Sequence, residues 1–322
     1  MKSPFQVLSV SKSTLVKGAC GVGLGYSSHN LLSGVEIVDK SSLVKDKQTT
    51  RIEDVELLGT IVRALSLMIC QLTGYAKDML EDLFTLFPVH SFDISVDAHL
   101  LHENGDFEED VWGVAGLILG LGNTIVAMYK AGTYNAVLET KRLISSWMPH
   151  GNSVLQYSDS FDDNSVRILS VGSCLALPAV MTFCHRFELM NGDELGHLIN
   201  VYKETISELL SVKKSTTSHQ NLLMASCIGA GNLLAGILNE GVCSIEVGCV
   251  QDLLELFRRC YSNPYSPLIH FGGMLGVVNA MGVGVGSLFN VHPTTSSVQI
   301  EHDLKVRYPT VMFLFTFKLV FL

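Results

Sequence analysis

Residues 108–132 read EEDVWGVAGLILGLGNTIVAMYKAG and contain small side chains at Gly116, Gly120 and Asn123. Each residue of an α-helix turns the chain by about 100°, so positions 0, +4 and +7 lie within about 60° of one another. The three residues therefore form a small-residue stripe along one side of the expected helix. Because such a stripe lets a second helix approach closely, the stretch predicts a buried packing helix.

The same small-residue stripe recurs along the chain, with first positions 45 to 56 residues apart. The six copies are Gly21/Gly25/Ser28, Ser66/Cys70/Thr73, Gly116/Gly120/Asn123, Gly172/Ala176/Ala179, Ala225/Gly229/Asn232 and Gly272/Gly276/Asn279. A period of about 50 residues is slightly longer than the ~40–47 residues of HEAT and armadillo units. This recurrence is typical of a repeat protein.

Most stripes are followed, after a turn, by an amphipathic segment. These segments are residues 75–87, 133–148, 193–210 and 244–261. Gly132, Gly192 and Gly241 stand before three of them, where the end of a helix favours a residue that tolerates positive φ. One unit is expected to be a helical hairpin, and stacked hairpins bury a continuous core. The sequence therefore predicts an all-α, HEAT/armadillo-like α-solenoid of about six units over residues 1–305.

Polar, acidic connectors interrupt this array and are expected to be solvated loops near residues 33–50, 88–110 and 150–165. Residues 306–322 differ from every unit and form an atypical hydrophobic tail. The tail has too few apolar residues for a membrane span of ~20. We interpret it as an appended or mis-spliced C-terminus.

The composition excludes some classes of function. Among 322 residues, 48% are hydrophobic and 16% are charged, and the formal net charge is −9. Direct binding of nucleic acid is not expected, because such binding depends on an excess of Lys and Arg near phosphates. The eight cysteines form no C-x-x-C pair, so zinc is not expected, and the thiols indicate a reducing, cytoplasmic compartment.

No catalytic, cofactor-binding or metal-binding site is expected. The Gly-rich strings at 18–30 and 282–287 lack both the strand context of a dinucleotide site and the Gly-Lys-Ser/Thr of a P-loop. His99 and His102 could share a helix face, but no third metal ligand lies near them in the sequence. The protein is therefore not expected to be an enzyme.

Three asparagines, Asn123, Asn232 and Asn279, recur at the same repeat position. Two interpretations remain open for them. They could be buried amides that cross-link neighbouring helices, which we favour because they share a face with the packing glycines. Alternatively, they could form a ladder that binds an extended peptide.

A multi-pass membrane protein is the main alternative to a soluble solenoid. Uncharged stretches run over Val111–Tyr129, Ser215–Asn239 and Cys260–Ile300, and each is long enough for a transmembrane helix. However, Gly, Ser and Asn dilute these stretches, and the amphipathic helices between them need water on one side. We therefore favour the soluble, cytoplasmic solenoid.

Four Gly-rich strings carry a resemblance to a known family: residues 16–28, 108–132, 222–241 and 269–286. They resemble the C-terminal region of the focadhesin-like family, to which the plant Resurrection protein belongs, and the similarity extends in order over about residues 1–305. Members of that family are much longer α-solenoids. The chain is therefore interpreted as a C-terminal piece or a truncated gene model.

The resemblance implies a function that composition and periodicity do not indicate. It implies a non-catalytic adaptor, without cofactors, that links the cytosolic RNA exosome to the Ski complex in 3′-to-5′ mRNA decay. RNA quality control of this kind limits small-interfering-RNA production, and in plants the family is tied to cuticular wax formation and embryo development. The expected partners are exosome and Ski subunits, and no family binding residue can be assigned to a position of this chain.

Overall fold

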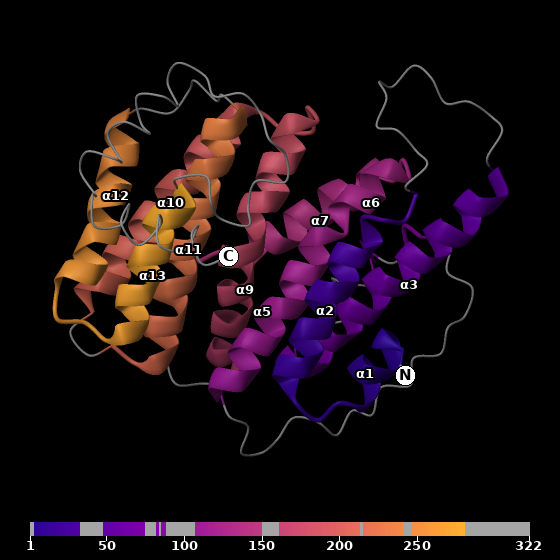
Figure 1. Cartoon of the computed structure of the whole chain (residues 1–322), viewed down its shortest axis with the longest axis horizontal. Coiled ribbons are helices and arrows are strands. Elements are labelled where there is room, and N and C mark those ends of the chain that lie inside the picture. Colours follow the sequence, from indigo (N-terminus) through magenta and orange to yellow (C-terminus); the bar gives the residue numbers. More distant parts are fainter. Residues whose placement is uncertain are drawn as a thin grey trace, which may run out of the picture. The chain divides into compact units, whose positions relative to one another are not determined.

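The computed structural model describes residues 3–32, 48–74, 82–83, 85–87, 107–149, 161–212, 215–240 and 247–280. Within these ranges the regular structure is helical and contains no strand, which confirms the all-α class (Figure 1). The chain divides into two compact units. The first comprises Met1–Met148 and Ser160–Ala176, and the second comprises Pro149–Asp159 and Leu177–Leu322.

The first unit is built around a pair of close-packed helices. Its helices are α1 (Pro4–Val10), α2 (Thr14–Ser28), α3 (Gln48–Thr73), α5 (Phe107–Asn123), α6 (Ile125–Lys130), α7 (Tyr134–Ser146) and the first part of α9 (Phe161–Arg186). Helices α2 and α5 lie side by side, and α3 packs against both of them. Helix α1 was not predicted, although Ser3 and Gln6 form a capping box that marks its start.

The apolar run between residues 111 and 129 is two helices rather than one. Helix α5 ends at Asn123 and α6 begins at Ile125, on either side of Thr124. The Thr124 hydroxyl donates a hydrogen bond to the Leu121 carbonyl oxygen at 2.6 Å, which satisfies a carbonyl at the break. After α6, Gly132 adopts a φ of 76°, and the chain turns into α7.

The second unit is also built from packed helices. Its helices are the last part of α9, α10 (Gly192–Ser211), α11 (Thr217–Glu240), α12 (Val247–Ser262) and α13 (Pro267–Val278). Helix α10 packs against α11 and α12, and α13 packs against both α11 and α12. Pro267 occupies the first turn of α13, where its missing N–H leaves no helical hydrogen bond unmade.

Several predicted boundaries are wrong. Helices α3, α5 and α9 begin at Gln48, Phe107 and Phe161, inside the expected loops near 33–50, 88–110 and 150–165. For α5 and α9, whose first turns are acidic, the reason is that acidic side chains are as favourable there as in a loop, because the N-terminal end of a helix carries partial positive charge; the first turn of α3 has no acidic residue. The other residues of these loops, most of segment 75–87, Gly241 and the tail 306–322 lie outside the described residues.

The expected helix end at Gly192 is also wrong. Gly192 is the first residue of α10, and the positive φ that follows α9 belongs to Glu188, at 55°. The Leu189 N–H donates to the Cys184 carbonyl at 2.8 Å, which closes the end of α9. The position of a glycine alone therefore did not identify the turn.

Candidate functional site

Helices α2 and α5 meet through backbone atoms along a run of glycines. The facing residues are Gly18 with Gly113 and Gly116, Gly21 with Leu117 and Gly120, and Gly25 with Gly120. The residue numbers increase in the same direction on both helices, so the two helices run parallel. This parallel pair is the most tightly packed part of the first unit.

The interface has no room for side chains. A Cβ atom at Gly116 would lie 2.7 Å from the Gly18 carbonyl oxygen, and one at Gly25 would lie 2.7 Å from the Gly120 Cα. Real Cβ atoms essentially never make contacts shorter than 3.0 Å. By contrast, a Cβ at Gly23, on the opposite side of α2, would have no atom within 4 Å.

The contact extends one helical turn before the predicted stripes. Gly18 and Gly113 were missed, although small residues at the same spacing precede the stripes in both helices. At this end, the Thr14 hydroxyl donates to Asp110 Oδ1 at 2.6 Å. At the other end, the buried Ser28 hydroxyl donates to the Gly25 carbonyl at 2.6 Å.

The stripe on α3 does not lie between those of α2 and α5. Ser66, Cys70 and Thr73 are buried, but α2 and α5 are in direct backbone contact with each other. The order of the stripes in the sequence therefore differs from the order of the helices in the packing.

The stripe on α9 begins at Gly172, which packs on α5. A Cβ at Gly172 would lie 2.5 Å from Ile118 Cδ1 and 3.2 Å from the Ala115 Cα. Ala176 is buried and Ala179 is half-buried.

In the second unit, α11 and α13 form another parallel contact. A Cβ at Gly272 would lie 2.8 Å from the Met224 Cα, and one at Gly276 would lie 2.9 Å from the Cys227 carbonyl oxygen. Gly231 also lies against Gly276. The face of α11 that meets α13 is therefore displaced by one or two residues from the predicted positions Ala225 and Gly229, which are themselves buried.

Contacts between helices of this unit join residues that are a similar distance apart in the sequence. The contacts of α11 with α13 join Met224 to Gly272 and Cys227 to Gly276. Between α10 and α12, Lys203 Nζ donates to Asp252 Oδ2 at 2.8 Å, and Cys249 Sγ donates to Asn200 Oδ1 at 3.2 Å. These four pairs are 48 or 49 residues apart, and the contact of Gly231 with Gly276 spans 45 residues, so all five lie close to the period of the stripes.

The three recurrent asparagines are half-buried rather than fully buried. The Asn123 carbonyl accepts a hydrogen bond from His29 Nε2 at 2.8 Å, so its backbone links α5 to the end of α2. The Oδ1 atom of Asn232 is buried and has no hydrogen-bond partner in the described part of the chain.

Two basic groups beside the glycine interface have altered pKa values. Lys17 is only 2% exposed, and burial lowers the pKa of its ammonium. Burial also lowers the pKa of His29; the hydrogen bond to Asn123 opposes this effect, and the charge of Lys130 adds to it. Lys130 Nζ donates a hydrogen bond to the His29 carbonyl oxygen at 2.9 Å, and this bond links the C-terminal ends of α2 and α6.

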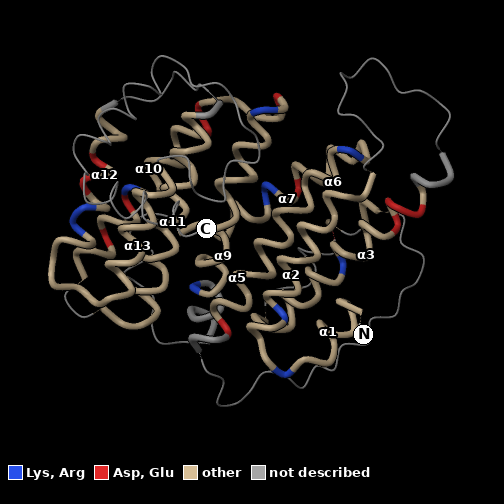
Figure 2. Tube along the Cα trace, viewed as in Figure 1, with Lys and Arg blue, Asp and Glu red and all other residues tan. Residues whose placement is uncertain are grey.

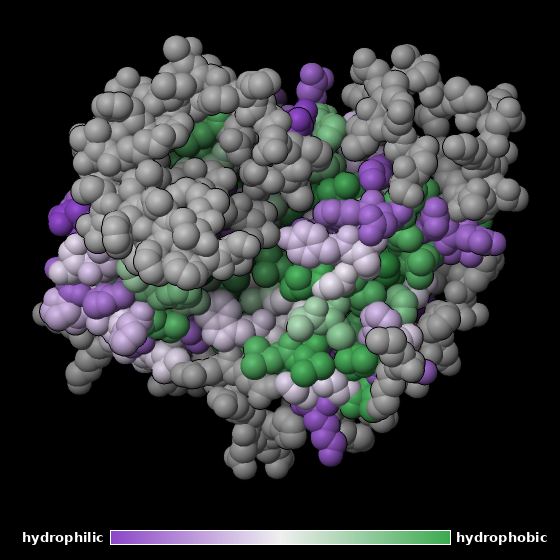
Figure 3. All heavy atoms as spheres, viewed as in Figure 1, coloured by the Kyte–Doolittle hydropathy of each residue, from purple (hydrophilic) through white to green (hydrophobic). Residues whose placement is uncertain are grey.

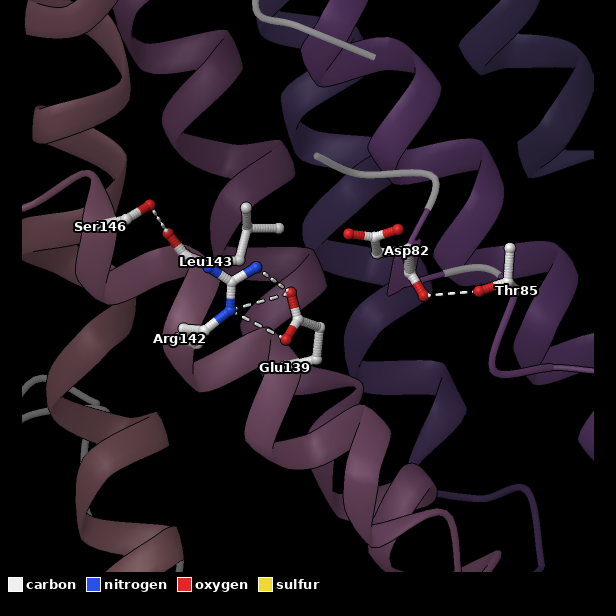
Figure 4. A network of polar contacts seen from close by, with 6 residues as sticks. All are labelled: Asp82, Thr85, Glu139, Arg142, Leu143 and Ser146. Carbon is white, nitrogen blue, oxygen red and sulfur yellow. Dashed lines mark hydrogen bonds and ion pairs between the residues drawn. The ribbon is translucent and has the colours of Figure 1, made fainter. Parts of the chain in front are cut away.

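Charged residues concentrate on the other helices. In Figure 2, α2, α5 and α13 are almost entirely uncharged, whereas charges appear along α7, α10 and α12. On α7, Arg142 pairs with Glu139 through its forked guanidinium, and the Ser146 hydroxyl donates to the Leu143 carbonyl at 2.7 Å (Figure 4). The amphipathic helices therefore place their ionic contacts on their exposed faces.

Apolar residues gather on part of the surface of the first unit (Figure 3). On α2, Leu15, Val16 and Tyr26 are between 40% and 48% exposed. No group of three metal-ligating side chains that could hold an ion occurs among the described residues, and His99 and His102 lie outside them.

Four segments of the described chain are long and apolar enough to cross a bilayer. They are Ile52–Thr73, Asp110–Lys130, Arg167–Arg186 and Thr217–Leu238. Length and composition alone do not distinguish a membrane span from a helix buried inside a protein.

No family model, curated protein or solved structure matches this chain. Its function is therefore argued from its own residues and from the resemblance of its Gly-rich helices.

Proposed function

We propose that the chain is a non-catalytic α-solenoid scaffold of the HEAT/armadillo kind that binds protein partners in the cytoplasm. The observation that carries this proposal is the similar sequence offset of the contacts in the second unit. Neighbouring hairpins in a solenoid repeat the same contacts one unit later in the sequence. The α10–α12 contacts have offsets of 49 residues and the α11–α13 contacts have offsets of 45 to 49 residues, so both pairs follow this rule approximately.

The parallel contact of α11 with α13 supports the same proposal. In stacked hairpins, the two helices of a hairpin run in opposite directions. The first helices of successive hairpins therefore run parallel to one another, and so do the second helices. Helices α11 and α13 are parallel, and α12 connects them. In the second unit, α11 and α13 carry almost no charge, whereas α10 and α12 are charged and amphipathic, so this unit combines packing helices with solvated ones.

The resemblance to the focadhesin-like family suggests the partners. We propose that the chain contributes to an adaptor between the RNA exosome and the Ski complex, with consequences for RNA silencing, cuticular wax and embryo development. The net charge of −9 favours contact with proteins, while the partners would handle the RNA.

The experiment is a pull-down of the tagged chain at moderate salt, with RNase present and a tag-only control, read by quantitative mass spectrometry. Enrichment of both exosome and Ski subunits is the expected result. RNase separates protein contacts from bridging by RNA. Loss of both sets of subunits after RNase treatment, or their absence throughout, would contradict the adaptor proposal for this chain.

A multi-pass membrane protein with a role in wax or lipid metabolism is the second candidate, because four segments reach the length and hydropathy of a span. The two candidates differ in alkaline carbonate extraction. An integral membrane protein stays in the pellet, whereas a scaffold is released to the supernatant.

A further inference from the structure

Two thiols face each other in the buried core of the second unit. Cys227 on α11 and Cys260 on α12 have their Sγ atoms 3.8 Å apart, and both residues are 0% exposed. A disulfide requires an S–S distance of about 2.05 Å, so the sulfurs must close by roughly 2 Å. Rotation about χ1 moves a sulfur by a distance of that order.

Helix α13 covers this pair. A Cβ at Gly273 would lie 2.6 Å from the Cys260 Cβ, and one at Gly276 would lie 2.9 Å from the Cys227 carbonyl oxygen. The backbone of α13 therefore rests directly on both cysteines. Because both residues are fully buried, a solute reaches the sulfurs through local opening, and α13, a helix of 12 residues, lies against both cysteines.

We propose that Cys227 and Cys260 are a redox-modification site: hydrogen peroxide converts them to a disulfide, and α13 controls the rate by shielding them. One thiolate attacks a peroxide oxygen, the O–O bond breaks, and a sulfenic acid and hydroxide form. The second thiolate then attacks the sulfenic sulfur, so that the S–S bond forms and the S–O bond breaks. Hydroxide leaves and takes up a proton. Overall, two thiols are oxidised, one peroxide is reduced and two waters form.

The disulfide would join α11 covalently to α12 beneath α13. This link would tie the two helices together within the core, so the rigidity of the second unit would depend on oxidant. The inference is independent of the proposed adaptor function, because it rests only on the two sulfurs and the helix that covers them.

The first experiment treats the reduced full chain with hydrogen peroxide under native conditions, blocks free thiols, and maps cross-links by mass spectrometry without reductant. The expected product has lost two hydrogens and contains a Cys227–Cys260 link. Cys227→Ser and Cys260→Ser should each abolish the link, whereas Cys249→Ser, on the half-buried face of α12, should retain it. A protein that stays fully reduced, forms separate sulfinic acids or links other cysteines would overturn the proposal.

The second experiment tests the shielding by α13. In Gly273→Ala, the new methyl group collides with Cys260, so α13 is displaced and the link should form several-fold faster. The control is Gly196→Ala on α10, where a Cβ would have no atom within 4 Å, and its rate should equal that of the unaltered chain. Urea below the unfolding transition offers a route that needs no variant, because local opening should accelerate the reaction. Equal rates in Gly273→Ala and Gly196→Ala, or no response to urea, would refute the shielding.

Discussion

Alanine substitutions at two glycines of α2 should change the stability of the first unit in opposite directions. Gly23 and Gly25 are two residues apart, but Gly23 faces open space and Gly25 faces the backbone of Gly120. Gly23→Ala should stabilise the helix by up to about 1 kcal/mol, because alanine has the higher helix propensity. Gly25→Ala gains the same propensity term, but its Cβ would lie 2.7 Å from the Gly120 Cα.

The cost at Gly25 follows from this distance. Carbon atoms pack best at about 3.5–4.0 Å, so α2 and α5 must separate by roughly 1 Å, and a gap of that size removes about a quarter to a half of each dispersion contact. Overpacking of this kind costs about 1–3 kcal/mol. After the propensity gain, Gly25→Ala should be between neutral and about 2 kcal/mol less stable than the unaltered chain, and about 1–3 kcal/mol less stable than Gly23→Ala.

Tryptophan fluorescence in urea measures this difference directly. Both tryptophans, Trp112 and Trp147, belong to the first unit, so their signal follows the unit that contains the substitutions. The midpoint should fall for Gly25→Ala relative to Gly23→Ala, with similar m-values. Gly120→Ala, on the opposite side of the interface, should behave like Gly25→Ala. If Gly25→Ala proves as stable as Gly23→Ala, the close approach of α2 and α5 is refuted.

Three further substitutions test the charged groups. The folded-state pKa of Lys17 is lowered, so the free energy of unfolding of the unaltered chain should rise with pH until the pH reaches 10.5, the ordinary pKa of lysine. Lys17→Met should remove this rise and increase the free energy of unfolding at pH 7. Urea titrations at several pH values measure both effects. The pKa of His29 is also lowered, so its contribution is present above 6.5 and is lost as the pH falls through the folded-state pKa. His29→Gln should therefore reduce the loss of stability on acidification, and an unchanged acid slope would contradict this assignment. Asp252→Asn removes the exposed ion pair with Lys203 and should change stability by less than about 1 kcal/mol, with the difference shrinking at high salt; a larger, salt-independent loss would show that the pair is not simply a solvated contact.

Local features of this fold were predictable because they depend on neighbouring residues in the chain. The spacing of Gly116 and Gly120 predicted a packing helix, and Gly132 predicted the turn before α7. The partner of each stripe was not predictable, because a smooth helix face admits any helix that can reach it. Nothing in the spacing indicated that α2 would meet α5 while α3 packed to one side.

The packing face of α11 illustrates a second limit. Small residues occur around much of this helix, so periodicity allowed the stripe at Ala225 and Gly229 as well as the face at Met224, Cys227 and Gly231. The contact with α13 depends on the rotation of α11 within its hairpin, which is set by tertiary packing. The proximity of Cys227 and Cys260 has the same origin, since no sequence motif relates two cysteines 33 residues apart.

The hydropathy of the packing helices has two physical explanations, and α3 distinguishes them best. The most apolar 18-residue window of the segment through α5 and α6 is 83% buried and that of α11 is 78% buried, so most of each window contacts other parts of the protein. The segment in α3 is only 50% buried, with Ile52 57% and Leu57 41% exposed. Glu53, Asp54 and Glu56 lie at the start of this segment, and Arg63 lies near its middle, where a bilayer core penalises an Arg by about 2.5–3.5 kcal/mol. Apolar side chains interspersed with carboxylates resemble the surface of a protein interface more than a lipid-facing helix, so α3 favours the scaffold proposal over the membrane alternative.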